Sequence, residues 1–290
     1  MDRKKETLGY LFAVLLYGMT GTLLRYTNVP GEVEAFVRGV IGCATILIIV
    51  KITGKQINKN ALFSQWKLLV ISGACLGLNW VLLFAAYKST SVAIASLLNN
   101  LAPIVLLAIS PVIFKTRLNW KQILCVIAVL VGVILISGIL EMPLENINKK
   151  GIFLALGSMF LFMILLICNR FFKELNALDK TVSQLMVAAA VMLPFMLISV
   201  RNTTVRPDLR TILILLFVGI FNTGIAYICY FNGVGTLPIQ TVAILAYLEP
   251  AESVILSALV LREPLSPLGI LGAVLIIGAA ACGELLSIHS

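Results

Sequence analysis

Charged residues and histidine are scarce in this sequence, and each scarcity excludes a class of protein. Only 12% of the 290 residues are charged and 60% are hydrophobic, whereas soluble domains have roughly 25% and 45–50%. A soluble protein this apolar would leave large hydrophobic patches facing water. The single histidine, His289, provides no basis for a histidine-based zinc site or a Ser/His relay.

Catalytic and nucleotide-binding motifs are also missing. The sequence contains no H-E-x-x-H, no G-x-S-x-G and no G-x-x-x-x-G-K-[ST]. None of the six cysteines belongs to a C-x-x-C pair and all lie in apolar segments, so we interpret them as packing residues. We therefore expect no enzyme, no cofactor and no metal site, and a pump driven by nucleotide bound to this chain is excluded.

What the sequence does have is a series of long apolar stretches. A transmembrane helix needs roughly 20 apolar residues, and turn formers such as those at 29–31 and 232–238 separate the stretches. The runs do not alternate apolar with polar residues, as strands of membrane barrels do. We predict an all-α integral membrane protein with ten transmembrane helices, at residues 7–24, 33–50, 68–87, 89–114, 122–140, 151–169, 181–200, 211–231, 239–261 and 264–283.

Lysine and arginine in the short loops predict the orientation. In the first half, most of them fall on the side that holds the N-terminus, among them Lys5, Lys51, Lys59, Lys67 and Lys115. Cytoplasmic loops carry this excess, and an even number of helices returns the C-terminus to the same side. We expect both termini in the cytoplasm, in a plasma or inner membrane. The net charge of +9 is explained by these loops, so no nucleic-acid partner is expected.

The chain repeats itself at a spacing of 147 residues. Gly77 then falls on Gly224 and Pro103 on Pro250 without a gap in the intervening loops. Each unit holds five helices, and because five is odd the second unit enters the membrane from the opposite side. Such inverted repeats are typical of secondary transporters, whose substrate site lies at the midplane between the repeats. A duplicated scaffold without transport is the alternative.

Several short motifs occur in the order and doubled spacing of a known family. These are Leu101-Ala102-Pro103 with Arg117-Leu118, Leu248-Glu249-Pro250, and Arg262-Glu263-Pro264-Leu265, between an entry helix from Gly9 to Arg25 and a glycine-bearing last helix from Gly269 to Gly283. With them the chain resembles an EamA-type transporter of the drug/metabolite transporter (DMT) superfamily. The resemblance implies a first EamA repeat at residues 1–140 with helices 1–5, a second at 150–290 with helices 6–10, and a central cavity open alternately to each side.

Glu249 is the most informative polar residue inside the predicted spans. It is the eleventh residue of its helix and lies about 15 Å deep at 1.5 Å per residue, near the middle of a roughly 30 Å core. A carboxylate there is costly and usually faces a cavity or a partner, and desolvation favours its protonated form. We predict either a proton-coupling or substrate-binding residue, or an acid that stays protonated and bonds a neighbouring helix. Pro250 and Pro103 are expected to kink their helices at matching positions.

Other amides and aromatic rings share this depth or the faces next to it. They suit a partly apolar organic solute, and Tyr17 and Trp80 could cage a cation; packing and interhelical hydrogen bonds are the alternative. For Arg38, nearer the outer end, we expect local pairing with Glu34 or snorkelling, with substrate binding as the alternative. The complete predicted substrate-binding set is Tyr17, Asn79, Trp80, Asn99, Asn100, Asn222, Tyr230, Tyr247 and Glu249.

Together these features predict a secondary active transporter of small organic solutes, most simply an exporter of amino acids or related metabolites and amines. It would work by alternating access around a midplane cavity, with the lipid bilayer and a small-molecule substrate as partners and protons as a candidate coupling ion. A non-transporting membrane scaffold or receptor and a proton-coupled importer of an organic cation are the alternatives.

Overall fold

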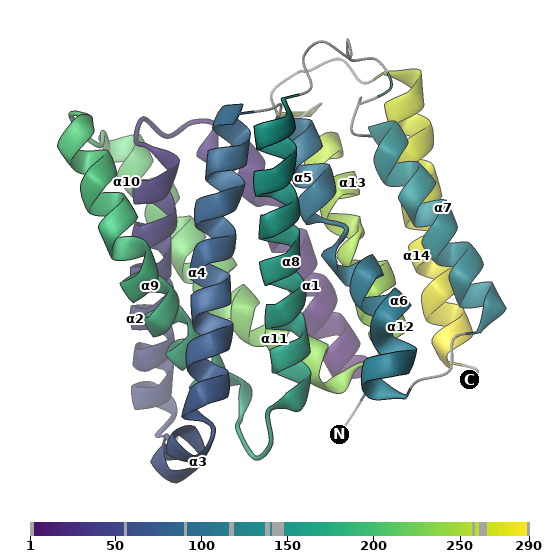
Figure 1. The fold of residues 1–290 in the computed structure, drawn as a ribbon, viewed down its shortest axis with the longest axis horizontal. Helices are drawn as coiled ribbons and strands as arrows, with labels where there is room; N and C mark the ends of the chain where they lie inside the picture. The colour runs from purple at the N-terminus through teal and green to yellow at the C-terminus, as the bar shows by residue number, and fades with distance from the viewer. Residues whose placement is uncertain are drawn as a thin grey trace.

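The computed structural model is all-α throughout the part of the chain that it describes, residues 3–54, 57–89, 92–115, 119–136, 140, 148–256, 259–260 and 266–288. Long helices stand side by side and roughly parallel (Figure 1). Their bounds are α1 Arg3–Leu24, α2 Gly31–Thr53, α3 Lys59–Ser64, α4 Trp66–Ser89, α5 Val92–Asn99, α6 Ala102–Phe114, α7 Trp120–Ile136, α8 Lys149–Phe171, α9 Ala177–Asn202, α10 Leu209–Phe217, η3 Val218–Ile225, α11 Ala226–Thr236, α12 Ile239–Ala246, α13 Leu248–Leu256 and α14 Pro267–Ile288.

The helices have the length and composition of membrane spans. Among the described residues, 7 helices are long and apolar enough to cross a membrane, and the segments Ile123–Leu135 and Pro267–Ala279 are shorter apolar helices. The α12–α13 pair supplies a further apolar segment. Large apolar side chains such as Ile48, Phe153, Ile198 and Val274 are exposed on the outside of the bundle, where a bilayer would cover them. The predicted all-α membrane fold is confirmed.

The two halves run in opposite directions. In Figure 1, α1 begins and α14 ends at the lower end of the molecule, whereas α8, the first helix of the second half, begins at the upper end. Each half therefore traverses the bundle an odd number of times. We call these two ends the lower end and the upper end below.

Both spans with a midplane proline are broken, and at the same place. α5 ends at Asn99, four residues before Pro103, and α12 ends at Ala246, four residues before Pro250. A proline ring clashes with the carbonyl group four residues earlier and removes one helical hydrogen bond. The predicted kinks are therefore confirmed as breaks that leave Asn100, Leu101 and Tyr247 between helices, close to the middle of the bundle.

Two features differ from the sequence expectation. The turn predicted over residues 232–238 is shorter, because α11 continues through Asn232 and Gly235 to Thr236 and only Leu237 and Pro238 separate it from α12. Before α11, the chain forms the π-helix η3, which no sequence pattern indicated. The motif residues Thr116-Arg117-Leu118 and Arg262-Glu263-Pro264-Leu265 lie outside the described residues.

Glycines set the closest helix contacts. A Cβ atom on Gly77 of α4 would lie 2.8 Å from the carbonyl oxygen of Ala188 on α9, and one on Gly132 of α7 would lie 2.8 Å from that of Gly272 on α14. Backbone cannot move aside as a flexible side chain does, so both positions require glycine. The α7–α14 pair forms one edge of the molecule, and α4 packs between α8 and α9 (Figure 1).

Candidate functional site

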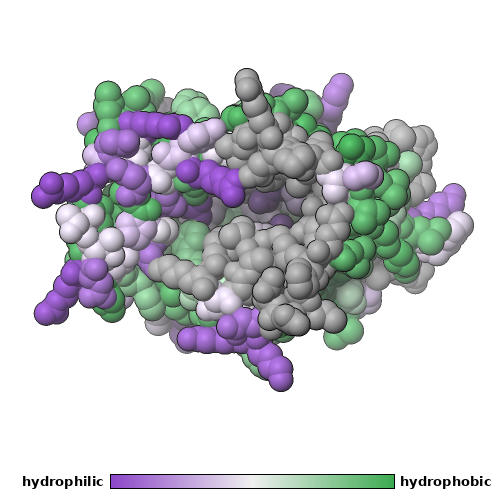
Figure 2. Space-filling view, turned by 90° about the horizontal axis from the view of Figure 1, so that it is seen from above, coloured by the Kyte–Doolittle hydropathy of each residue, from purple (hydrophilic) through white to green (hydrophobic). Residues whose placement is uncertain are grey.

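A cavity lies beside the two helix breaks. It is lined by side chains of both halves: Tyr17, Asn100, Pro103, Phe162, Tyr230, Ala246, Tyr247 and Glu249. The space that the centre of a water molecule reaches inside it is about 40 Å³, enough for a few waters. Seen from the upper end, the molecule is hollowed near its centre (Figure 2). In this conformation the cavity must widen before it can hold an organic solute.

One contact at the cavity joins two residues at equivalent positions of the repeats. The hydroxyl group of Tyr247 donates a hydrogen bond to the backbone carbonyl oxygen of Asn100, 147 residues earlier in the chain. Two equivalent positions of an inverted repeat can touch only if both lie close to the pseudo-two-fold axis that relates the repeats. The cavity therefore lies at the axis, between the repeats.

Glu249 is the acid of the cavity, and it has a second carboxylate beside it. Among the described residues its own carboxylate accepts no hydrogen bond, and it is within electrostatic range of Glu252 and of Arg38. Glu252 lies one turn further along α13, against α1, where a Cβ on Gly18 would approach its Oε2 to 2.6 Å. Sequence reasoning missed Glu252, although its spacing of three residues from Glu249 places both on one helix face.

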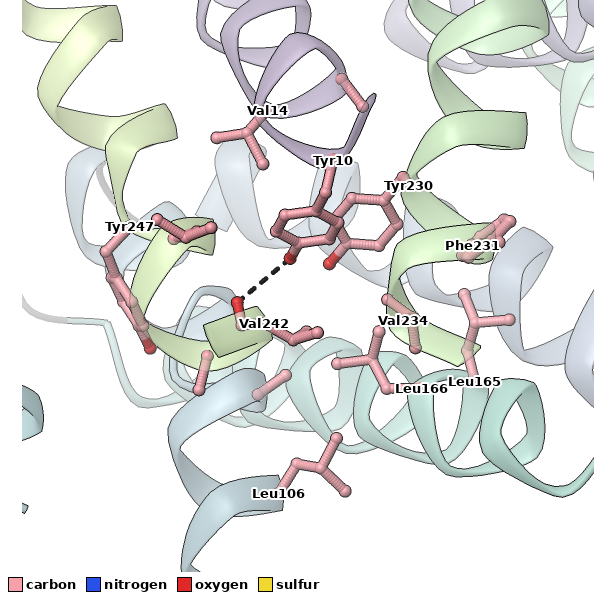
Figure 3. Close-up of a cluster of buried hydrophobic side chains, with 14 of the residues drawn as sticks. Tyr10, Val14, Leu106, Leu165, Leu166, Tyr230, Phe231, Val234, Val242 and Tyr247 are labelled. Atoms are coloured by element: carbon pink, nitrogen blue, oxygen red, sulfur yellow. Dashed lines mark hydrogen bonds between the residues drawn. The ribbon is translucent and has the colours of Figure 1, made fainter. Parts of the chain in front are cut away.

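Aromatic rings form the wall toward α1 and α11. Tyr17 makes an edge contact with Tyr227 at 5.4 Å between ring centroids and a tilted contact with Tyr230 at 5.4 Å. Tyr10 stacks on Tyr230 at 5.0 Å, and Figure 3 shows both rings between α1 and α11. The hydroxyl group of Tyr17 is buried without a hydrogen-bond partner among the described residues, so it is available to a ligand or water in the cavity.

Asn79 and Asn99 are part of a hydrogen-bonded cluster outside the cavity lining. The Nδ2 atom of Asn79 lies 2.9 Å from Oδ1 of Asn99 and 2.7 Å from Oγ of Ser158. Ser158 also donates to Oδ1 of Asn99 at 2.7 Å. The cluster joins α4 and α8 with the last residue of α5. Interhelical bonding, the alternative reading of these amides, therefore accounts for both of them in this conformation.

Asn222 likewise bonds a neighbouring helix. Its Nδ2 atom donates to the carbonyl oxygen of Leu16 and to Oγ1 of Thr20, each at 2.7 Å, and so fastens η3 to α1. Its Oδ1 atom is buried without a partner among the described residues. The amide lies next to the helix that carries Tyr17 but does not line the cavity.

Arg38 contacts an aromatic ring on another helix. Its guanidinium carbon lies 4.1 Å from the centroid of the Trp80 ring, a distance typical of cation–π stacking. Glu34 instead accepts a hydrogen bond from Thr27, and no carboxylate among the described residues is within ion-pair distance of Arg38. The side chain lies against an indole ring that is only 5% exposed, and it still attracts Glu34 electrostatically. Local pairing, snorkelling and substrate binding therefore all stay predictions for Arg38.

Below the cavity, polar contacts close the lower end. Tyr10 precedes the cavity residue Tyr17 by seven residues, and Val242 precedes the cavity residue Glu249 by the same number. Seven residues span about 10 Å along a helix. The hydroxyl group of Tyr10 donates to the carbonyl oxygen of Val242 at 3.1 Å (Figure 3). These residues form a layer between the cavity and the lower end.

Just beneath that layer, half-buried Arg170 bonds the turn between α11 and α12, and buried Lys180 bonds α11 itself. A terminal nitrogen of Arg170 on α8 donates to the carbonyl oxygen of Leu237 at 2.8 Å. Nζ of Lys180 on α9 donates to the carbonyl oxygen of Phe231 at 2.9 Å. Cations near a helix C-terminus interact favourably with its free carbonyl groups and dipole. We call the Arg170 and Lys180 hydrogen bonds the lower latch.

The structure thus divides the predicted site. Cavity-lining positions are held by Tyr17, Asn100, Tyr230, Tyr247 and Glu249, while Asn79, Asn99 and Asn222 bond neighbouring helices and Trp80 supports Arg38. Whether these residues bind substrate remains a proposal. Sequence reasoning missed Phe162, Tyr227 and Glu252, and it named Pro103 only for its kink.

A family model and several proteins match this chain. The model of the EamA-like transporter family matches residues 5–138 and again residues 149–282. "Uncharacterized transporter YxxF" of Bacillus subtilis (strain 168) is 25% identical over 262 residues, which cover 88% of this chain and 82% of that protein. Protein PecM of Dickeya dadantii (strain 3937) is 25% identical over 231 residues, covering 78% of this chain and 75% of its own.

Two further matches also cover most of this chain. "Uncharacterized transporter YwfM" of Bacillus subtilis (strain 168) is 24% identical over 270 residues, covering 92% of this chain and 89% of that protein. A crystal structure superposes on 99% of this chain and 99% of its own with a TM-score of 0.87 at 21% identity. That likeness concerns the fold alone.

Proposed function

Because the chain belongs to the EamA-like transporter family and is a multi-pass membrane transporter, we propose that it is a secondary active exporter of small organic solutes, amino acids or related metabolites and amines. Transport proceeds by alternating access around the cavity beside Glu249. The observation that carries the proposal is this cavity at the pseudo-two-fold axis, where both repeats supply lining residues and where transporters built from inverted repeats bind their substrates.

The chemistry of the lining supports the substrate class. The cavity offers an acid at Glu249, an unpartnered hydroxyl group at Tyr17, and aromatic surfaces at Tyr230 and Phe162. An ammonium group is attracted both to a carboxylate and to a ring face. A phosphorylated solute needs several cationic donors, and the lysine and arginine of the lower latch already bond backbone carbonyl groups. Neutral, zwitterionic and cationic solutes therefore fit better than sugar phosphates.

Flux in proteoliposomes tests the proposal. We expect labelled amino acids or amines to be moved by the reconstituted protein, and unlabelled members of the same classes to compete, whereas sugar phosphates do not. Liposomes without protein are the control for leakage. Binding of a sugar phosphate that is independent of Glu249, with no binding of amines or amino acids, would overturn the substrate class.

The two alternatives give different results in the same vesicles. A scaffold or receptor would bind a solute without moving it across the bilayer. A proton-coupled importer of an organic cation would concentrate a labelled quaternary amine on the side that corresponds to the cytoplasm when the opposite side is acidified. Net efflux of amino acids from preloaded cells supports export over both.

We also propose that the lower end faces the cytoplasm. Both termini lie at that end (Figure 1), together with Lys51, Lys59, Lys67 and Lys115, and cytoplasmic loops carry such cations. We expect a fluorescent protein fused after Ser290 to fold and fluoresce in the cytoplasm, and alkaline phosphatase inserted within residues 140–148 to be active outside. An external C-terminus would contradict this orientation.

A further inference from the structure

Arg38 has a buried nitrogen atom that lacks a partner. Its Nε atom makes no hydrogen bond among the described residues. Its guanidinium carbon lies 4.1 Å from the centroid of the Trp80 ring, and a guanidinium group stacked on a ring can still bond through the N–H groups at its edge. Arg170, whose Nε atom is also buried without a partner among the described residues, donates through a terminal nitrogen to a carbonyl group, and Lys180 donates to another.

A series of aromatic ring contacts leads from the ring beneath Arg38 to a residue that lines the cavity. The Trp80 ring lies 6.1 Å from the Tyr227 ring, and Tyr227 lies 5.4 Å from Tyr17, which lines the cavity. Tyr227 is also within electrostatic range of both Arg38 and Glu249.

Arg38 is within electrostatic range of Glu249 and of Glu34 but makes no direct ion pair with either among the described residues. Leaving its buried Nε atom without a partner is costly unless a ligand or water completes the hydrogen bond. A solute with a carboxylate at one end and an ammonium group at the other satisfies both residues at once.

We propose that Arg38, held by Trp80, is the carboxylate-binding residue of the site and that it selects zwitterionic amino acids, whose ammonium group is bound by Glu249. This inference rests on the proposed function and narrows it. Arginine is suited to the role because its fork matches the two oxygens of a carboxylate. The upper face is hollowed near its centre (Figure 2), and the proposal has the solute enter from this end.

Binding to the purified full-length protein in nanodiscs tests the inference. The twenty proteinogenic amino acids are screened first, and the tightest is compared with its decarboxylated amine and its deaminated acid; for leucine these are 3-methylbutylamine and 4-methylpentanoate. We expect the amino acid to bind more tightly than either analogue. In Arg38→Gln its Kd rises at least about tenfold, the loss of a charged hydrogen bond, while the Kd of the amine is unchanged or lower because a like charge has been removed.

Matched variants keep the result interpretable. Arg210 also lies on an aromatic ring, 4.0 Å from the centroid of Tyr26, but far from the cavity lining, so Arg210→Gln should leave every Kd unchanged. Arg38→Lys retains the charge without the two-pronged guanidinium group and should bind amino acids with an intermediate Kd. This variant is used in place of Arg38→Gln if Arg38→Gln does not fold.

Each other outcome has a distinct meaning. If Arg38→Gln weakens the amine as much as the amino acid, Arg38 only supports the fold and the inference is wrong, while the proposed function stands. The same holds if the wild-type protein binds amines but no amino acid. If the wild-type protein neither binds nor transports any solute of these classes, the proposed function itself fails.

Discussion

Replacing Glu249 with glutamine is expected to remove the pH dependence of transport while leaving the fold intact. Glutamine keeps the shape and a hydrogen-bonding group but cannot exchange a proton. Glu249 lies about 15 Å from the lower end of its broken helix in a cavity with little water, so its ionised form is disfavoured unless a cationic group lies beside it. Alternating access exposes such a residue to each side in turn and so links proton movement to solute movement.

The measurement is the initial rate of flux in proteoliposomes over a series of pH values, for the wild type and for Glu249→Gln. Charged and titratable groups near Glu249 are Glu252 on its own helix, Tyr10 and Tyr17 on α1, Arg38 on α2, and Tyr227 and Tyr230 on α11. Glu252→Gln is the matched control: it removes a repelling charge, so the wild-type profile should move toward lower pH rather than disappear. An unchanged profile in Glu249→Gln means that this acid has only a structural role.

Replacing Arg170 with methionine is expected to open the lower end. The variant loses the charged hydrogen bond to the Leu237 carbonyl but retains much of the apolar volume. A hydrogen bond to a charged group contributes about 1.5–3 kcal/mol, so the population with an open lower end should rise about 10–100-fold. Hydrogen–deuterium exchange should therefore become faster in the turn after α11 and along α12, Ile239–Ala246.

A control substitution at the same end of the molecule shows whether the change in exchange is specific to the lower latch. Lys173 follows α8 and its side chain is exposed, so Lys173→Met removes a positive charge without touching the lower latch and should leave exchange unchanged. Exchange in α7 and α14 should not change in either variant. If Arg170→Met leaves the α11–α12 turn as protected as in the wild type, the lower latch does not hold this end closed.

The repeat supplies no charged counterpart of the lower latch. Positions 147 residues before Arg170 and Lys180 hold Leu23 and Val33, which carry no charge. Because the repeats are inverted, these positions belong to the opposite end of the bundle. Under the proposed alternating access, we therefore expect the charged hydrogen bonds to favour the state that is closed at the lower end.

Sequence periodicity was sufficient for the architecture but not for its irregular parts. Apolar length and the 147-residue repeat predicted the all-α membrane fold, and Pro103 and Pro250 predicted the positions of the helix breaks. The π-helix η3 was not predictable, since it packs tightly against another helix, α2: a Cβ on Gly219 would meet Ile41 and one on Gly224 would meet Thr45. Glycine at Gly233 and Gly235 suggested a loop, yet in a membrane helix it permits close packing instead: a Cβ on Gly233 would meet the Tyr10 ring at 2.6 Å.

For the candidate site, the sequence predicted how deep the residues lie in the membrane but not which partners their side chains face. Counting 1.5 Å per residue placed Glu249, Asn99 and Asn100 near the same level. The side chain of Asn99 joins the cluster with Ser158, whereas Asn100 lines the cavity and its backbone carbonyl accepts the hydrogen bond of Tyr247. The contact of Arg38 with Trp80 was not predictable for the same reason, because Trp80 is on another helix and no local spacing reveals it.

The hydrogen bond between Tyr247 and Asn100 has a consequence for how the two repeats exchange conformations. In such an exchange each repeat adopts the arrangement of the other, so every contact between residues i and j is replaced by the contact between their counterparts. The lower latch would be lost in that operation, whereas a pair of counterparts maps onto itself, although the bond from the Tyr247 hydroxyl to the Asn100 carbonyl does not. We therefore expect these two positions to remain neighbours in both arrangements, with the largest displacements at the two ends of the bundle.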